Sequence, residues 1–179
     1  MIMIDSGKTK LDSIIIVNDF DEESVLEFRS DVERVLKKNT DTLKVIIDSY
    51  GGEIYSAFAM LDILKNVEKP VETCAIGKAM SCGAMLLICG GTPGYRCAGE
   101  LSTIMLHEIS GTAEGKMQDI VIETEEYNRL NKIMLEYIDV ATGSKIGRTK
   151  SLLQKKVGDW YISPKEAVKY KFIDKIGVF

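Results

Sequence analysis

The feature of this sequence that most constrains its fold is a threefold alternation of short strand-like runs with stretches of helical periodicity. Leu11–Val17 ends in four β-branched residues, and Asp21 then offers an N-cap for a helix. Leu43–Asp48 is followed by a helical period over Tyr55–Asn66, and Val71–Ile76 by a segment that is apolar on every side, as a buried helix is. Three strand-then-helix units in succession predict an α/β layered fold, with active groups at strand ends and helix starts.

The longest periodic segment runs from about Lys116 to Ala141. At roughly 25 residues, this predicted helix is about twice the mean length of a globular helix. We therefore expect it to project beyond a small domain and to bring part of its apolar surface, with Ile133 and Ile138, against another subunit. Shorter elements are predicted at Tyr95–Ala98, Ser102–Leu106, Pro164–Tyr170 and Ile173–Ile176.

Length and composition indicate one globular domain over residues 1–179. The chain has 179 residues, of which 45% are hydrophobic and 28% charged, which is enough for one substantial core. A net charge of −4 argues against a nucleic-acid partner. The start of the chain meets charge too early for a signal peptide, and no apolar run has the length of a membrane span, so we expect a cytoplasmic protein.

The four cysteines argue against a metal site. They stand eight, seven and eight residues apart, without close Cys-x-x-Cys pairs, and one histidine accompanies them. We expect reduced thiols in the core and no bound metal. The cysteines are Cys74, Cys82, Cys89 and Cys97.

The single histidine restricts the possible chemistry. A serine hydroxyl becomes a strong nucleophile only when a base accepts its proton and a third group orients that base. Ser81 lies between a predicted strand and a predicted helix, and His107 follows the strand predicted at Ser102–Leu106. Asp159 is the natural third group, which gives the chain order Ser, His, Asp.

The position of Ser81 at a helix start also predicts an oxyanion-binding site. Free N–H groups and the helix dipole favour negative charge there, and the N–H of Cys82 is one expected donor. The glycine pair Gly51-Gly52 follows a strand and offers a second donor, because backbone without a Cβ can approach an acyl carbon.

Each of these signals has a simpler structural explanation. A serine at a helix start is often only an N-cap, a Gly-Gly pair is often only a turn, and a lone histidine often only makes a structural hydrogen bond. The Cys82 thiol beside the serine is a further candidate nucleophile. The residues alone leave these alternatives open.

Four separated blocks of sequence resemble the Clp protease proteolytic subunit family, ClpP, in order and spacing from about Ile14 to Asp174. The family's fold is a spiral of ββα units, shared with the crotonases, with a protruding handle helix that falls here on about residues 116–141. The blocks are Ile47–Gly52, Gly77–Leu87, Met105–Glu108 and Asp159–Ala167.

The resemblance implies a serine endopeptidase with a role for each candidate residue. Ser81 would be the nucleophile, His107 the general base and then acid, and Asp159 the group that orients His107. The N–H groups of Gly52 and Cys82 would form the oxyanion hole. Gly111 and Gly115 fall in the segment that binds a peptide as an added strand.

The resemblance also implies an assembly. ClpP subunits form heptameric rings that usually stack in pairs around a chamber. An AAA+ unfoldase feeds unfolded proteins or peptides into it, so ATP enters only through the partner and the subunit itself needs no cofactor.

Several positions differ from the family pattern. Tyr50 replaces a proline before the glycine pair, Glu108-Ile109 replaces Gln-Pro after the histidine, and Thr112 replaces a glycine. Val157-Gly158 replaces a charged pair that links rings, which leads us to expect stacking mainly through the handle helix. Only Met1–Lys10 precede the first apolar stretch, which is short for contacts with an unfoldase and points to a phage-encoded or accessory member.

Two other functions fit parts of this pattern. A crotonase-type acyl-CoA enzyme would share the fold and the oxyanion hole, but it uses carboxylates as acid and base and has no need of Ser81, His107 and Asp159 together. A non-catalytic ClpP-like ring subunit would normally have lost one of these three residues, and all three are present.

Overall fold

The computed structural model describes residues 13–38, 40–156 and 158–179. The first residues of the strand predicted at Leu11–Val17, the N-terminal segment Met1–Lys10 and Val157 lie outside the described residues. The elements, in chain order, are β1 (Ile14–Val17), α1 (Glu22–Leu36), β2 (Leu43–Ser49), α2 (Ile54–Lys65), β3 (Val71–Met80), α3 (Cys82–Gly90), β4 (Arg96–Ala98), β5 (Thr103–Leu106), α4 (Met117–Ala141), α5 (Arg148–Lys156), β6 (Trp160–Ile162), α6 (Pro164–Tyr170) and β7 (Lys175–Ile176).

The strands of the described residues form one seven-stranded, mostly parallel sheet. The order β1-β2-β3-β4-β7 is parallel throughout, whereas β5 pairs in parallel with β3 and antiparallel with β6. Strand β3 is long enough to pair with β4 through Thr73–Ala75 and with β5 through Lys78–Met80. The carboxyl end of β3 therefore joins the main sheet to the β5–β6 pair through its pairing with β5.

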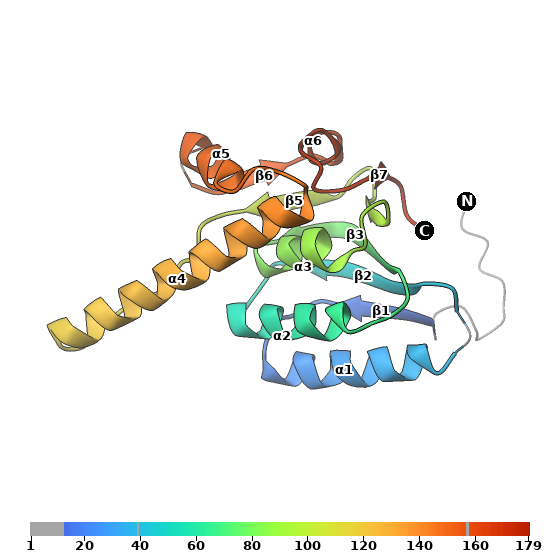
Figure 1. Cartoon of the computed structure of the whole chain (residues 1–179), viewed down its shortest axis with the longest axis horizontal. Coiled ribbons are helices and arrows are strands. Elements are labelled where there is room, and N and C mark those ends of the chain that lie inside the picture. Colours follow the sequence, from blue (N-terminus) through green and yellow to red (C-terminus); the bar gives the residue numbers. More distant parts are fainter. Residues whose placement is uncertain (1–12, 39, 157) are drawn as a thin grey trace.

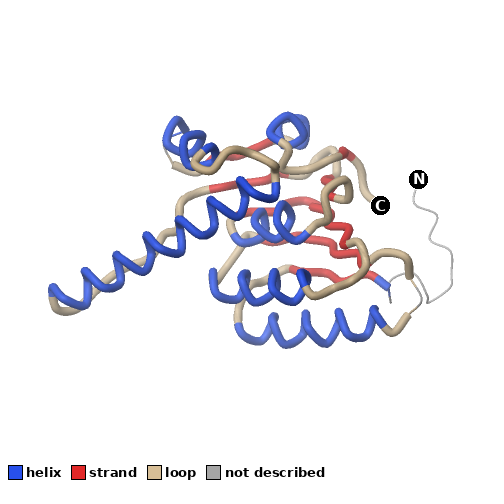
Figure 2. Tube along the Cα trace, in the orientation of Figure 1, coloured by secondary structure: helices blue, strands red, loops and turns tan. Residues whose placement is uncertain are grey.

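Helices α1, α2 and α3 lie side by side along the sheet, and α5 and α6 lie beyond the β5–β6 pair (Figures 1 and 2). Each of the first four helices contacts the next one along the chain. In α1 the buried residues Phe28, Val32 and Val35 follow the helical repeat, and Asp21 caps the helix by accepting a hydrogen bond from the N–H of Ser24 at 2.7 Å. The α/β prediction is confirmed, and the mostly parallel sheet with its flanking helices is consistent with the Clp protease fold.

Helix α4, the predicted handle, projects from the body of the molecule (Figure 1). Its N-terminal half exposes Met117, Val121 and Ile122, whereas its C-terminal half buries residues in the core. Ile138 is 0% exposed, so the expectation that it meets another subunit was wrong: it packs in the core of its own subunit. Helical periodicity shows where an apolar stripe lies but not which surface covers it.

Two elements escaped sequence analysis. Helix α5 is strongly polar and buries only Thr149 and Leu153, so it has little apolar periodicity to detect. Strand β6 has three residues, which are too few to show an alternating hydrophobic pattern. It is defined by its antiparallel pairing with β5, which the sequence does not reveal. The last strand is also shorter than predicted, since Ile173 is a buried residue that precedes it.

Three further findings bear on function. All four cysteines are free. Cys74, Cys82 and Cys97 are buried, as expected of core thiols, whereas Cys89 is half-buried. No helix within the described ranges has the length and apolar character to cross a membrane. In the same ranges, no group of three or more His, Cys, Asp or Glu side chains is arranged to hold a metal ion.

Candidate active site

Ser81 occupies a tight turn between β3 and α3. Its backbone angles, φ 51° and ψ −117°, lie in a region that non-glycine residues rarely adopt. Two backbone hydrogen bonds hold the turn: the N–H of Ser81 donates to the carbonyl of Met105 at 2.9 Å, and the N–H of Met85 donates to the carbonyl of Ser81 at 3.0 Å. The Ser81 side chain makes no capping bond, so the simple N-cap explanation fails and the hydroxyl is available for another partner.

His107 is brought to Ser81 by the pairing of β3 with β5. Met80 and Met105 are register partners, so the residues just beyond them lie at the same edge of the sheet. The Nε2 atom of His107 lies 2.8 Å from the Oγ atom of Ser81. When the hydroxyl donates to Nε2, the remaining proton of a neutral imidazole is on Nδ1. The structure therefore joins the two predicted residues in the geometry of a nucleophile and its base.

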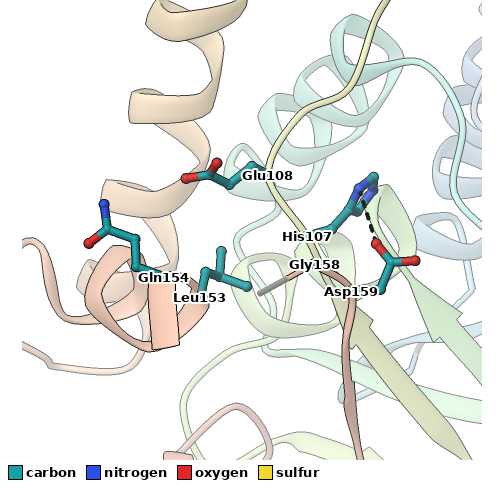
Figure 3. Close-up of a pocket in the computed structure, with 6 residues that line it drawn as sticks. All are labelled: His107, Glu108, Leu153, Gln154, Gly158 and Asp159. Atoms are coloured by element: carbon teal, nitrogen blue, oxygen red, sulfur yellow. Dashed lines mark ion pairs between the residues drawn. The ribbon is translucent and has the colours of Figure 1, made fainter. Parts of the chain in front are cut away.

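Asp159 lies on the other side of the histidine ring, just before β6. The register pair Leu106–Trp160 places it beside His107, but Oδ1 is 3.9 Å from Nδ1, which is longer than a hydrogen bond (Figure 3). These two residues line a pocket of about 350 Å³ with Glu108, Leu153, Gln154 and Gly158. The Glu108 carboxylate points away from the imidazole in Figure 3, so Asp159 is the carboxylate that faces His107.

The glycine pair lies directly against the Ser81 turn. A Cβ atom on Gly51, which has φ 105°, would stand 2.8 Å from the Cβ of Ser81 and 3.2 Å from the N atom of Cys82. A Cβ on Gly52, with φ 154°, would stand 2.4 Å from the carbonyl oxygen of Phe20. Only glycine fits at either position, and the pair does more than turn the chain, because it brings backbone to the nucleophile.

A second pocket of about 180 Å³ brings four of the predicted residues together. It contains Gly52, Ser81, Cys82 and His107. The N–H of Cys82 is one of the first N–H groups of α3, which have no carbonyl partner within the helix. The pocket also has residues to which sequence analysis gave no role at the site: Glu53, Ile54, Ile109, Ser110, Tyr127 and Met134. Those on α2 and α4 occupy ordinary helical positions, so nothing in the sequence distinguished them from core residues.

The Cys82 thiol is poorly suited to nucleophilic attack. It is 3% exposed, and its Sγ atom donates to the carbonyl of Gly52 at 3.2 Å. Burial raises the pKa of Cys82, so the neutral thiol predominates near pH 7. The geometry favours Ser81 over Cys82 as the reactive group.

The two glycines of the expected peptide-binding segment lie at different distances from the pocket. The segment, residues 107–116, has no strand of its own in this structure. Gly111 contacts the ring of Tyr127, a residue of the smaller pocket, because a Cβ at this glycine would stand 2.4 Å from Cζ of that ring. Gly115 has φ 130° and lies beside Asp119 at the start of α4. Gly111 thus borders the site, whereas Gly115 belongs to the entry of the handle helix.

Comparison with known proteins identifies the family of this chain. Residues 10–178 match the family model described as Clp protease. The chain is also 35% identical, over 130 residues, to the ATP-dependent Clp protease proteolytic subunit 2 of Parasynechococcus marenigrum (strain WH8102). This match covers 73% of the chain but 64% of the relative, so it spans less than two thirds of the relative's length. The fold, the site and the family match together show that the chain belongs to the Clp protease family.

Proposed function

We propose that this protein is a serine endopeptidase. The observation that carries the proposal is the 2.8 Å contact between Ser81 Oγ and His107 Nε2 at a strained strand-to-helix turn. Backbone strain at a site of this kind persists only where the surrounding structure enforces it, and it often accompanies function. The Clp protease family match and the name of the relative support the same activity.

In the proposed mechanism, Ser81 attacks the carbonyl carbon of a peptide bond while His107 takes the hydroxyl proton. The N–H groups of Cys82 and Gly52 stabilise the oxyanion that forms. His107 then gives the proton to the leaving amine, and water hydrolyses the acyl-enzyme by the same route. Asp159 stabilises the imidazolium, which requires it to come about 1 Å closer to Nδ1 than the 3.9 Å in this structure.

The proposed substrates are peptides and unfolded proteins. An extended chain would lie along the segment of residues 107–116, on the side that Gly111 borders, and would place one side chain in the pocket of about 180 Å³. Ile54, Tyr127 and Met134 make much of the wall of this pocket apolar. The proposal includes no metal and no cofactor.

The proposed assembly is a cytoplasmic pair of stacked heptameric rings built from single-domain subunits. Exposed apolar residues on the projecting half of α4, Met117, Val121 and Ile122, support self-association through this helix. The relative's name includes the words ATP-dependent and proteolytic subunit, which supports a partner ATPase of the AAA+ class.

Labelling with a fluorophosphonate probe, followed by mapping of the modified residue, tests this function. We expect modification of Ser81 and none in the Ser81→Ala protein. Labelling of another residue would refute the assignment. A folded protein that resists the probe and cleaves no peptide would instead favour a non-catalytic ring subunit. Nothing in the fold or the comparisons favours an acyl-CoA enzyme.

A further inference from the structure

The segment that follows His107 is tied to the handle helix by one side chain. The N–H of Ile109 donates to the Oδ1 atom of Asn131 at 3.2 Å. Strand β5 ends at Leu106 and α4 begins at Met117, so the backbone between them is held by neither strand pairing nor helical hydrogen bonds. Among the hydrogen bonds recorded for the described residues, this one alone joins the backbone of residues 108–115 to another element. The position of the segment therefore depends on Asn131.

A second contact, one helical turn earlier on α4, supports the first. Tyr127 and Asn131 stand four residues apart and so lie on the same side of the helix. Gly111 packs against the Tyr127 ring, closely enough that a Cβ would meet it. Tyr127 and Ile109 are both part of the pocket that contains Ser81. The pair of α4 residues thus holds two points of the segment along one wall of the site.

This tie depends on the type of residue at position 109. The residue there is isoleucine, which carries a backbone N–H. Proline carries no N–H, so the bond to Asn131 exists only because isoleucine stands there. A half-buried backbone N–H needs a partner, and Asn131 supplies it.

We propose that Asn131 is a positioning residue, which holds the backbone at Ile109 so that the segment beginning there is set to receive a peptide. The inference rests on the proposed peptidase function and extends it to a residue of the handle helix. The hydrogen bond of Asn131 is made to Ile109, whereas Ser81 and His107 bond to each other. His107 is fixed independently by the β5–β6 pairing, so the effect of Asn131 should fall on peptide binding rather than on the reactivity of the serine.

Steady-state cleavage of a short fluorogenic peptide tests the proposal. Asn131→Leu removes the acceptor at similar size, and we expect KM to rise about 3- to 10-fold, the effect of losing one neutral hydrogen bond. We expect kcat and the rate of fluorophosphonate labelling to change less than 2-fold. Asn131→Asp keeps an acceptor oxygen and should restore KM to within about 2-fold of the unmodified protein. Asn128→Leu makes the same change at an exposed position on the same helix and should have no effect.

A double-mutant cycle separates the hydrogen bond from other effects of the leucine. Ile109→Pro removes the N–H, so Asn131→Leu should raise KM no further in that background. The inference fails if KM is unchanged in Asn131→Leu, if Asn131→Asp behaves like the leucine variant, or if the two changes are additive. It also fails if labelling falls together with KM, because Asn131 would then support the whole site.

Hydrogen exchange gives a measurement that needs no variant. The Ile109 amide of the unmodified protein should exchange more slowly than the neighbouring amides of residues 110–114, since it is the bonded one. Equal exchange at all of these amides would overturn the inference. Labelling of Ser81 in the unmodified protein is a separate result, so a failure of the peptidase proposal and a failure of this inference can be told apart.

Discussion

The two ring nitrogens of His107 lie at different distances from their partners: Nδ1 is 3.9 Å from Oδ1 of Asp159, whereas Nε2 is 2.8 Å from Oγ of Ser81. Asp159 is half exposed, and the adjacent Gly158 has φ 102° with open space around it. The serine–histidine contact of the proposed triad is therefore formed in the isolated chain, and the histidine–aspartate hydrogen bond is not.

Ser81→Ala and His107→Ala should each lower kcat for a short peptide by at least about 10³-fold. Their combination should be no worse than either alone, because the two residues act as one unit. Asp159→Asn should lower kcat by about 10²- to 10⁴-fold. Single-turnover kinetics provide the measurement. An Asp159→Asn protein with full activity would exclude Asp159 from the mechanism and leave a serine–histidine pair.

Cys82→Ala should retain most of the peptidase activity and the fluorophosphonate labelling. The Cys82 thiol is buried and its pKa is raised by that burial, so iodoacetamide should modify it slowly at pH 7.5 in the folded protein and quickly in urea. Quantitative mass spectrometry of the alkylated peptides follows both states. Rapid alkylation of Cys82 that abolishes activity in the folded protein would contradict this assignment.

Gly51→Ala should reduce kcat/KM by at least about 10²-fold, because its Cβ would displace the Ser81 turn or the Cys82 N–H. Gly94→Ala is the matched control. Gly94 also has a positive φ, 91°, but its missing Cβ faces open space, so this change adds backbone strain without a clash. We expect near-normal kinetics for Gly94→Ala. Similar losses in both variants would mean that backbone strain, not contact with Ser81, explains the effect.

Asp174→Asn should destabilise the fold by about 3–5 kcal/mol, because it leaves the guanidinium of Arg96 buried without its charge partner. Arg96 is 4% exposed, and its Nη2 donates to Asp174 Oδ1 at 2.7 Å. Urea unfolding at pH 7 measures the loss. As a control, Glu33→Gln removes one partner of an exposed pair with Arg29 and should change stability little.

The same ion pair predicts a pH dependence. Burial raises the pKa of Asp174, but the hydrogen bonds and charge of Arg96 outweigh it, so the pKa is lowered from 3.8. A carboxyl with a lowered pKa stabilises the fold above the unfolded value and loses that contribution as pH falls through the folded value. Stability should therefore decline below about pH 3.8, and less so in Asp174→Asn. Parallel declines in both proteins would assign the acid sensitivity to other groups.

Changes on the two halves of α4 should have different consequences. Ile122→Glu lies on the exposed projecting half and should weaken self-association while leaving the subunit folded. Ile138→Glu lies in the core and should unfold the subunit. Sedimentation velocity and circular dichroism distinguish the two results. Unchanged assembly in Ile122→Glu would show that this part of the handle is not an interface.

The sequence by itself determined those helices, strands and candidate site residues that are encoded by neighbouring residues in the chain. The helix starts at Asp21 and Pro164, the strand–serine–helix order around Ser81 and the extent of the long helix are all set by residues close in the chain. The unique histidine limited the possible base to His107. Such features depend on capping, periodicity and backbone preference, which act over a few residues.

Only the tertiary structure decided which residues far apart in the sequence are in contact. Such contacts depend on strand register and on which part of the protein covers the apolar face of each helix. The β3–β5 register brought His107 to Ser81, and the β5–β6 register left Asp159 at 3.9 Å. Packing of α4 buried Ile138 in the core and brought Asn131 within hydrogen-bonding distance of Ile109. The periodicity of the helix alone did not predict either contact. Helical periodicity can be recognised within one segment of the sequence. Burial and contact also require a second segment, and the tertiary fold determines which segment that is.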